Sequence, residues 1–241
     1  MKSLGVIPAR LESSRLPGKV LLDICGKPMI QHVWEKAICS QLDDVIIATD
    51  SNEVVDVAKD FGANVFLTSS NHTSGTSRLV ELSQSIKSDL YINIQGDEPL
   101  ISPQLINDLI QARKLCSSRN IFTAANSACT EEEYLSPNVV KLITDVNMDA
   151  IYFSRSPIPY YRNENSKFSP LKHIGIYGYT FDGLQYYKSF GESLLETVES
   201  LEQLRFIENG QKIRVITTEY ESIGVDTEDD LLRVRYLLDS K

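Results

Sequence analysis

Short, mostly apolar runs alternate with amphipathic segments through the first half of the chain. Runs of this kind are typical of strands buried on both faces of a parallel sheet. Each is followed by a segment whose apolar positions recur at helical spacing. The pattern predicts strands at 3–9, 45–49, 65–68 and 90–95 and helices at 29–38, 52–61, 75–86 and 103–116.

The second half has shorter links between its apolar segments, which favours antiparallel or mixed pairing. Residues 160–170 are polar and flanked by proline, as expected of a loop. We therefore predict an α/β fold with a mixed, mostly parallel sheet, helices on both faces and a smaller antiparallel extension. Further strands are expected at 121–125, 139–143, 150–154 and 174–179, and helices at 194–208 and 227–239.

The organisation of the chain predicts a single domain over residues 1–241, because it has no Gly- or Ser-rich linker, no low-complexity tract and no internal repeat. Its net charge of −9 argues against a nucleic-acid partner or an anionic membrane surface, which would need a basic face. No apolar run is long enough to span a bilayer, and the first one is too short for a signal peptide. Four widely spaced cysteines fit a reducing cytoplasm.

Three cations follow the first predicted strand. Arg10, Arg15 and Lys19 lie in a polar loop at 10–19, together with the hydroxyl of Ser14. The carboxyl ends of parallel strands share one edge of the sheet, where ligands of open α/β folds bind. Cations, hydroxyls and turn amides suit a triphosphate. The loop has the glycine spacing of neither a Walker P-loop nor a dinucleotide site, and a solvated surface loop is the alternative.

Two aspartates are candidates for a divalent cation. Asp97 comes directly after the strand at 90–95, and Gly96 before it permits close backbone approach. Asp226 precedes the helix at 227–239. Mg²⁺ takes one or two carboxylates together with phosphate oxygens and water. Alternatively, Asp97 is a turn residue and Asp226 is the N-cap of the helix. Spacing alone leaves open whether the two carboxylates lie close together.

Further polar candidates lie in the second half. His173 precedes the strand at 174–179, whose two glycines mark a bulge or the approach of a ligand. It could donate a hydrogen bond to an anionic or hydroxylated substrate, or be a structural histidine. Arg155 follows the strand at 150–154 and could clamp a carboxylate. Helical spacing predicts one shared face for Glu199, Glu202 and Gln203. The alternative is that this face is a solvated surface.

Taken together, these motifs resemble those of the 3-deoxy-manno-octulosonate (Kdo) cytidylyltransferases, also called CMP-Kdo synthetases. Single segments are shared with other sugar nucleotidyltransferases, but their combination is specific. They run in order along nearly the whole chain. The matching segments are 7–10, 14–19, 26–30, 48–50, 74–78, 95–99, 137–141, 152–155, 173–179, 201–205 and 224–227.

The resemblance implies a Rossmann-like nucleotidyltransferase fold and a Mg²⁺-dependent reaction of CTP with a 3-deoxy-ulosonic acid. The products would be the CMP-sugar and pyrophosphate, for lipopolysaccharide biosynthesis. It also implies a cytoplasmic homodimer with no nucleic-acid or membrane partner. Residues of about 1–120 would bind the nucleotide, and residues of about 121–241 would bind the sugar acid and dimerise through the antiparallel extension.

The resemblance also implies a role for each matched residue. Arg10, Lys19, Asp97 and Asp226 would be catalytic, and the two aspartates would ligate the Mg²⁺. The nucleotide would be bound by Arg10, Ser14, Arg15, Lys19, Ser74, Gly75, Arg78 and Gln95. The sugar acid would be held by Arg155, His173, Tyr177, Glu202 and Gln203.

The chain departs from the family pattern at two places. Ser77 stands where the family usually has a glutamate before the arginine, and the segment at 195–199 is looser than usual. The exact acid therefore stays open between Kdo and the alternatives, which are 8-amino-Kdo and a nonulosonic acid. A catalytically silent nucleotide-binding protein is the remaining alternative, against which the retained charged residues argue.

Overall fold

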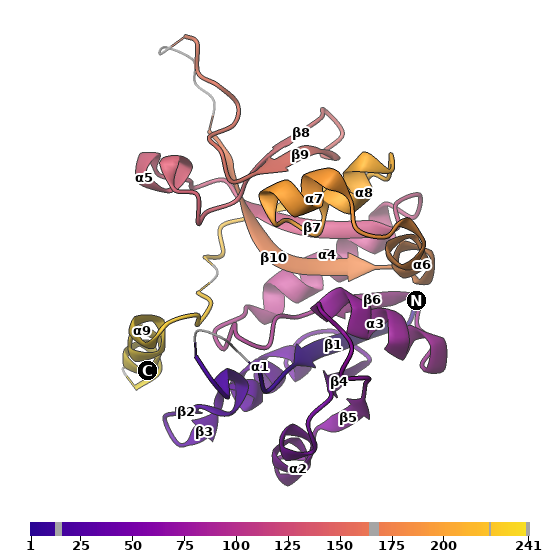
Figure 1. Cartoon of the computed structure of the whole chain (residues 1–241), viewed down its shortest axis with the longest axis vertical. Helices are drawn as coiled ribbons and strands as arrows, with labels where there is room; N and C mark the ends of the chain where they lie inside the picture. The colour runs from indigo at the N-terminus through magenta and orange to yellow at the C-terminus, as the bar shows by residue number, and fades with distance from the viewer. Residues whose placement is uncertain (13–15, 164–168, 222, 240–241) are drawn as a thin grey trace.

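Strands from both halves of the chain form the central sheet of the computed structural model, which describes residues 1–12, 16–163, 169–221 and 223–239. In this described part, nine strands share one sheet, and its main path runs in the order β11-β7-β10-β6-β1-β4-β5 (Figure 1). The strands on this path are β1 (Ser3–Ala9), β4 (Asp44–Thr49), β5 (Asn64–Leu67), β6 (Leu90–Asn93), β7 (Ile121–Asn126), β10 (Leu171–Tyr179) and β11 (Ile213–Thr218).

The parallel core of the sheet is centred on β1. It pairs in parallel with β4 on one side and with β6 on the other, so Val6 lies beside both Ile46 and Asn93. Val6 and Ile7, which point to opposite faces of the strand, are both fully buried. The carboxyl ends of these strands therefore meet at one edge, as the apolar pattern predicts.

The antiparallel part of the sheet is built on β10, which runs against both β6 and β7. Its register on β7 shifts between Ile174 and Tyr177, in the glycine-containing segment for which the sequence allows a bulge or the approach of a ligand. A hairpin extends the sheet from β10 and consists of β8 (Lys141–Thr144) and β9 (Ala150–Ser154). The predicted α/β class, the mixed sheet and its antiparallel extension are confirmed.

Helices cover both faces of the sheet. Apolar residues of α1 (Met29–Ile38), α2 (Asn52–Asp60) and α4 (Pro103–Leu115) share one core cluster with the sheet. A second cluster on the opposite face includes residues of α3 (Gly75–Ser85), α6 (Phe181–Phe190) and α8 (Leu204–Glu208). In the described chain, no helix is both long and apolar enough to cross a bilayer.

The C-terminal helix α9 (Glu228–Asp239) returns to the N-terminal half, where it lies against the hairpin of β2 (Asp23–Ile24) and β3 (Lys27–Pro28) (Figure 1). Val225, Leu231 and Val234 pack there in a small cluster with Ile24 and Met29. This packing fixes the segment just before α9, and with it Asp226, beside the loops that follow β1 and β6.

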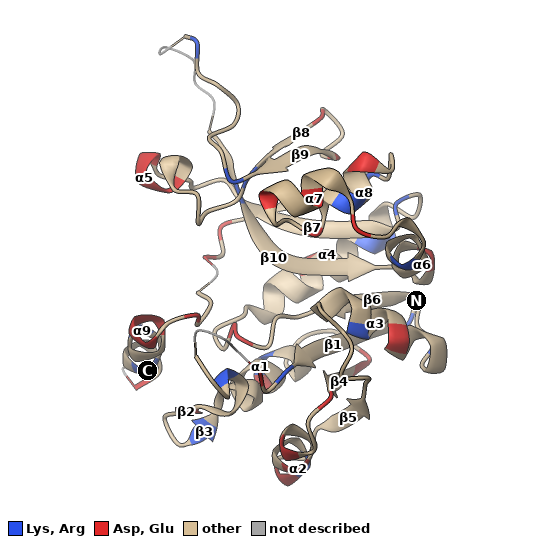
Figure 2. Cartoon of the chain, viewed as in Figure 1, with Lys and Arg blue, Asp and Glu red and all other residues tan. Residues whose placement is uncertain are grey.

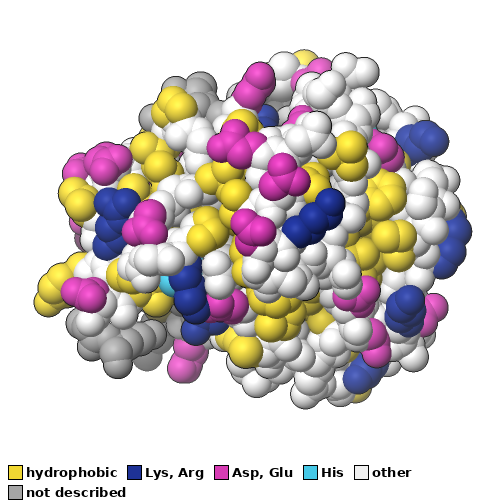
Figure 3. Space-filling model, turned by 90° about the horizontal axis from the view of Figure 1, so that it is seen from below, with side chains coloured by type: hydrophobic (Ala, Val, Ile, Leu, Met, Phe, Trp, Pro, Cys, Tyr) yellow, Lys and Arg dark blue, Asp and Glu magenta, His cyan; other side chains and the backbone are white. Residues whose placement is uncertain are grey.

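Charged residues of both signs are spread over the molecule. Acidic groups lie in the first turns of α2, α9 and the short helix α5 (Glu131–Leu135) (Figure 2). On the face seen in Figure 3, Lys and Arg side chains lie among Asp and Glu. The described Lys and Arg side chains of that face form no continuous basic surface of the kind that a polyanion would need.

One helix prediction is wrong. The segment at 194–208 is not a continuous helix but two short ones, α7 (Leu194–Glu199) and α8, separated at Ser200, whose φ of 52° is left-handed. A residue in this conformation ends a helix. Glu199 is therefore the last residue of α7, whereas Glu202 and Gln203 lie in the turn before α8, so the three do not share one helical face.

Candidate active site

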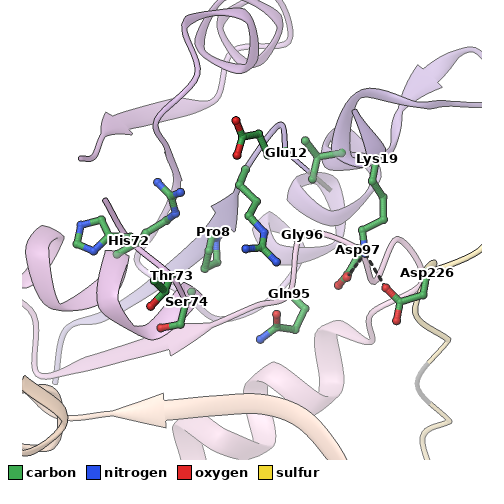
Figure 4. Close-up of a pocket in the computed structure, with 14 residues that line it drawn as sticks. Pro8, Glu12, Lys19, His72, Thr73, Ser74, Gln95, Gly96, Asp97 and Asp226 are labelled. Atoms are coloured by element: carbon green, nitrogen blue, oxygen red, sulfur yellow. Dashed lines mark hydrogen bonds and ion pairs between the residues drawn. The ribbon is translucent and has the colours of Figure 1, made fainter. Parts of the chain in front are cut away.

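A polar cleft lies at the carboxyl edge of the parallel strands. Its walls come from the loop after β1, the N-terminus of α3, the segment after β6 and the residue that precedes α9 (Figure 4). The lining residues include eight of the predicted site residues, namely Arg10, Lys19, Ser74, Gly75, Arg78, Gln95, Asp97 and Asp226. Ser14 and Arg15, two further nucleotide-binding candidates, lie outside the described residues.

Asp97 and Asp226 meet in this cleft, although 128 other residues separate them in the chain. The Nζ of Lys19 lies 2.6 Å from Oδ2 of Asp97 and 2.9 Å from Oδ1 of Asp226 (Figure 4). One ammonium group thus bridges two carboxylates. The juxtaposition that sequence spacing left open is present.

A backbone contact fixes this geometry. The N–H of Val225 donates to the carbonyl of Asp97 at 2.9 Å, which ties the segment before α9 to the turn after β6. Val225 itself is fully buried. Gly96 allows the turn to approach β1, because a Cβ at this position would lie only 2.8 Å from the carbonyl oxygen of Pro8.

The electrostatics of the three groups suit a cation between two acids. Burial lowers the pKa of Lys19, but the ion pairs with Asp97 and Asp226 outweigh this and raise it above its ordinary value. The two carboxylates fit the oxygen ligands that Mg²⁺ prefers. Among the described residues, no group of three or more acidic, His or Cys side chains is placed to hold a metal alone. A bound Mg²⁺ would thus also need phosphate oxygens or water.

The N-terminus of α3 forms another wall of the cleft. Ser74 is its N-cap, and its Oγ accepts a hydrogen bond from the N–H of Ser77 at 3.1 Å. Gly75 packs against Pro8, with only 3.1 Å between its ideal Cβ position and Cγ of that ring. The free N–H groups of a helix start and its dipole favour negatively charged ligands.

Arg78 and Gln95 line the cleft but are also held by protein groups. Arg78 is buried and donates to Oδ2 of Asp50 at 2.7 Å and to Oγ1 of Thr68 at 2.6 Å. Nε2 of Gln95 donates to the carbonyl of Gly175 on β10 at 3.1 Å. Arg78 therefore braces the strand ends, and Gln95 connects the cleft with the bulged segment of β10.

His173 and Tyr177 lie together on β10, outside the lining of the cleft. The Tyr177 hydroxyl lies 2.9 Å from Nε2 of His173, which is also 3.2 Å from Oγ1 of Thr123. Phe153 packs edge-on against the imidazole. Burial lowers the pKa of His173 to about 3 and raises that of Tyr177 well above its usual value. Both side chains are therefore neutral hydrogen-bonding groups near pH 7.

The remaining candidates for the sugar acid lie around α7 and α8. Oε2 of Glu202 accepts a hydrogen bond from the hydroxyl of Tyr187 at 3.2 Å. Gln203 is buried, with no hydrogen-bond partner for Nε2 among the described groups. Arg155 is directed at the end of α7, where Nε donates to the carbonyl of Glu199 at 2.8 Å. None of the three lines the cleft.

Three cleft residues with polar side chains were not identified from the sequence, namely Glu12, His72 and Thr73. His72 pairs with Glu81 of α3. The sequence could have indicated His72, because the segment after the strand at 65–68 must reach the same sheet edge as the ends of the other parallel strands.

The chain is similar to known cytidylyltransferases over most of its length. Residues 4–213 match the family model described as cytidylyltransferase. A 3-deoxy-manno-octulosonate cytidylyltransferase from Trichlorobacter lovleyi is 42% identical over 98% of both chains. One with the same name from Saccharophagus degradans is 45% identical over the full length of both. The solved structure of CMP:2-keto-3-deoxy-manno-octonic acid synthetase complexed with CTP has a TM-score of 0.96 and 45% identity, covering 100% of this chain and 99% of its own.

The fold and the cleft thus define a nucleotidyltransferase, and the predicted nucleotidyltransferase fold is confirmed. The chain belongs to the 3-deoxy-manno-octulosonate cytidylyltransferase family.

Proposed function

We propose that the protein transfers a cytidylyl group from CTP to the 3-deoxy-ulosonic acid Kdo in a Mg²⁺-dependent reaction, giving CMP-Kdo and pyrophosphate for lipopolysaccharide biosynthesis. The observation that carries this proposal is the pair of carboxylates, Asp97 and Asp226, that share Lys19 beside a helix N-terminus in one cleft. The names of the relatives and of the CTP-complexed structure support the choice of CTP and Kdo. We further propose a cytoplasmic homodimer that needs neither nucleic acid nor membrane.

The N-terminal half binds the nucleotide in this proposal. Arg10 and Lys19 neutralise the triphosphate, with Ser14 and Arg15 contributing from the same loop. The cytidine lies against Ser74, Gly75, Arg78 and Gln95. Charge neutralisation and fixed orientation are the main contributions that a protein makes to phosphoryl-type transfers.

Asp97 and Asp226 would hold the Mg²⁺, which would polarise the attacked phosphate and lower charge repulsion. The anomeric hydroxyl of the acid attacks the α-phosphorus of CTP and loses its proton to solvent water. The new bond joins that oxygen to phosphorus, the bond to the β-phosphate oxygen breaks, and pyrophosphate leaves. No side chain becomes a covalent nucleophile.

The C-terminal half holds the acid. Arg155, His173, Tyr177, Glu202 and Gln203 supply one guanidinium, one carboxylate and several neutral hydrogen-bonding groups. The neutral state of His173 follows from its pKa of about 3. It therefore recognises the acid through a hydrogen bond rather than through charge.

A second candidate substrate is 8-amino-Kdo or a nonulosonic acid. The observation that favours it is Ser77, which stands where the family usually has glutamate. Its Oγ donates to the carbonyl of Ser74 at 2.8 Å, so the side chain folds back on the helix start. A serine here is shorter than a glutamate and carries no charge, next in the chain to Arg78 of the cleft lining.

Pyrophosphate release tests the proposal. We expect rapid release with CTP, Mg²⁺ and Kdo, and none when either the acid or the metal is omitted. Parallel assays with 8-amino-Kdo and neuraminate identify the preferred acid by kcat/KM. No CTP consumption with any of the three acids would instead support a catalytically silent nucleotide-binding protein.

A further inference from the structure

Tyr187 of α6 lies between the two sides of the proposed site. Its side chain is buried and packs in the cluster formed by α3, α6 and α8. Its hydroxyl reaches Ser74 at the start of α3 and Glu202 before α8. No role was assigned to this residue from the sequence.

The hydrogen bonds of the hydroxyl have a defined direction. Tyr187 donates its single proton to Oε2 of Glu202 at 3.2 Å. The Oγ of Ser74 lies 3.0 Å from the same hydroxyl and therefore donates to it. Ser74 Oγ in turn accepts from the N–H of Ser77 as the helix cap. A continuous chain thus leads from the N-terminus of α3 to the carboxylate of Glu202.

The ring of Tyr187 is held by two neighbouring side chains. The guanidinium of Arg205 lies 4.2 Å from its centroid, and Phe206 packs against it with centroids 6.1 Å apart. Arg205 is itself fixed by two hydrogen bonds to Glu196, of 2.7 and 2.6 Å. A phenylalanine ring at this position would keep these contacts, so removal of the hydroxyl can be tested alone.

The environment keeps this hydroxyl a donor. Burial and the nearby Glu202 carboxylate raise the pKa of Tyr187 to about 12. The phenol therefore stays protonated over the working range of an enzyme and does not act as a base.

We infer that Tyr187 is a positioning residue that orients the Glu202 carboxylate toward the acid substrate from an anchor on the nucleotide-binding helix α3. The inference rests on the proposed function, because it takes Glu202 as a ligand of the acid. Tyr187 touches neither substrate. It acts by restricting the Glu202 carboxylate to one orientation, and its own hydroxyl is anchored by Ser74, the N-cap of α3.

The test combines Tyr187→Phe with Glu202→Ala in a double-mutant cycle, with KM for CTP and for the acid measured separately. We expect Tyr187→Phe to raise the KM of the acid about fivefold to tenfold, as for the loss of one ordinary hydrogen bond, and that of CTP by less than about twofold. In the Glu202→Ala background the same substitution should add almost nothing, because the group that it orients is absent.

Tyr91→Phe is the matched control. The Tyr91 hydroxyl is also inside the fold and makes two hydrogen bonds, with the carbonyl of Ile86 and the N–H of Ser88, but does not reach the cleft. We expect this variant to unfold at a lower temperature with both KM values unchanged.

Four results would overturn the inference. If the wild type is active, additive effects of Tyr187→Phe and Glu202→Ala on the KM of the acid would overturn the inference but not the proposed function. An unchanged KM of the acid in folded Tyr187→Phe would do the same. If Glu202→Ala leaves that KM unchanged, the role of Glu202 is wrong as well. A wild type that consumes no CTP with any of the acids would overturn the proposed function together with the inference.

Discussion

The two sides of the proposed site solve different problems of recognition. On the nucleotide side, Lys19, Asp97 and Asp226 carry charges that are partly open to solvent and hold one another in place. On the acid side, His173 and Tyr177 are neutral and are oriented by aromatic packing and hydrogen bonds. Charge suits a polyanion and its metal, whereas directed neutral groups, which here accompany the charged Arg155 and Glu202, suit the hydroxyls of a sugar, for which geometry decides specificity.

The largest effect is expected from loss of one carboxylate on the charged side. Asp226→Asn keeps the shape of the side chain but removes half of the proposed metal ligands. We expect kcat/KM to fall about 10²- to 10³-fold and the Mg²⁺ concentration for half-maximal rate to rise. Initial rates over a Mg²⁺ series measure both quantities. An unchanged Mg²⁺ dependence would show that Asp226 is not a ligand.

Lys19→Met tests the other partner of the ion pairs. The substitution leaves two neighbouring carboxylates without their shared cation, so we expect the free energy of unfolding to fall by about 1–2 kcal/mol in metal-free buffer. Added Mg²⁺ should then stabilise the variant more than the wild type, because it binds between the carboxylates. Thermal unfolding with and without Mg²⁺ provides the measurement. Equal Mg²⁺ effects on both proteins would argue against the shared site.

The neutral side predicts a pH dependence. His173 has a pKa of about 3 when folded and about 6.5 when unfolded, so the unfolded chain binds its proton first. The contribution of His173 to the free energy of unfolding is fully present above about pH 6.5. It is lost as the pH falls toward 3, by up to about 1.4 kcal/mol per pH unit. His173→Gln removes this contribution. Denaturant unfolding of the wild type and of His173→Gln should give a difference in the free energy of unfolding that varies with pH between about 3 and 6.5. A difference that does not change with pH would refute the lowered pKa of His173.

The smallest effect concerns the start of α3. Ser77 is the third residue of this helix, and a glutamate there can form a capping box with Ser74. We expect Ser77→Glu to raise the free energy of unfolding by about 0.5–1 kcal/mol. Ser77→Gln separates the hydrogen bond from the charge. A lower melting temperature in both variants would mean that the existing Ser77–Ser74 bond is the better cap.

Much of the fold could be predicted from local pattern. In the first half, the predicted strands and helices lie within a few residues of their expected bounds, because apolar runs and helical spacing report burial directly. The short strands β2 and β3 were not predicted. Three elements of the second half, α5, α6 and β11, were not predicted. The break at Ser200 was also missed, because a left-handed non-glycine residue leaves no pattern in hydrophobicity.

The candidate site could be predicted only in part. Parallel topology brings the loops after β1 and β6 together, so the proximity of Lys19 and Asp97 follows from the sequence. The arrival of Asp226 depends on the packing of α9 against β2 and β3, which is a tertiary contact with no local signal. Tyr187 was missed for a related reason, because its polar hydroxyl is hidden in an apolar helical face.

The account depends most on the metal-holding role of Asp97, and pyrophosphate release by Asp97→Ala with CTP, Mg²⁺ and Kdo tests it most directly. Asp108→Ala is the control, because this carboxylate on α4 does not line the cleft and accepts a hydrogen bond from Gln104. We predict that Asp97→Ala, while folded, is at least about 10³-fold slower than the wild type, whereas Asp108→Ala is unaffected. A folded Asp97→Ala protein that releases pyrophosphate at close to the wild-type rate would contradict the account.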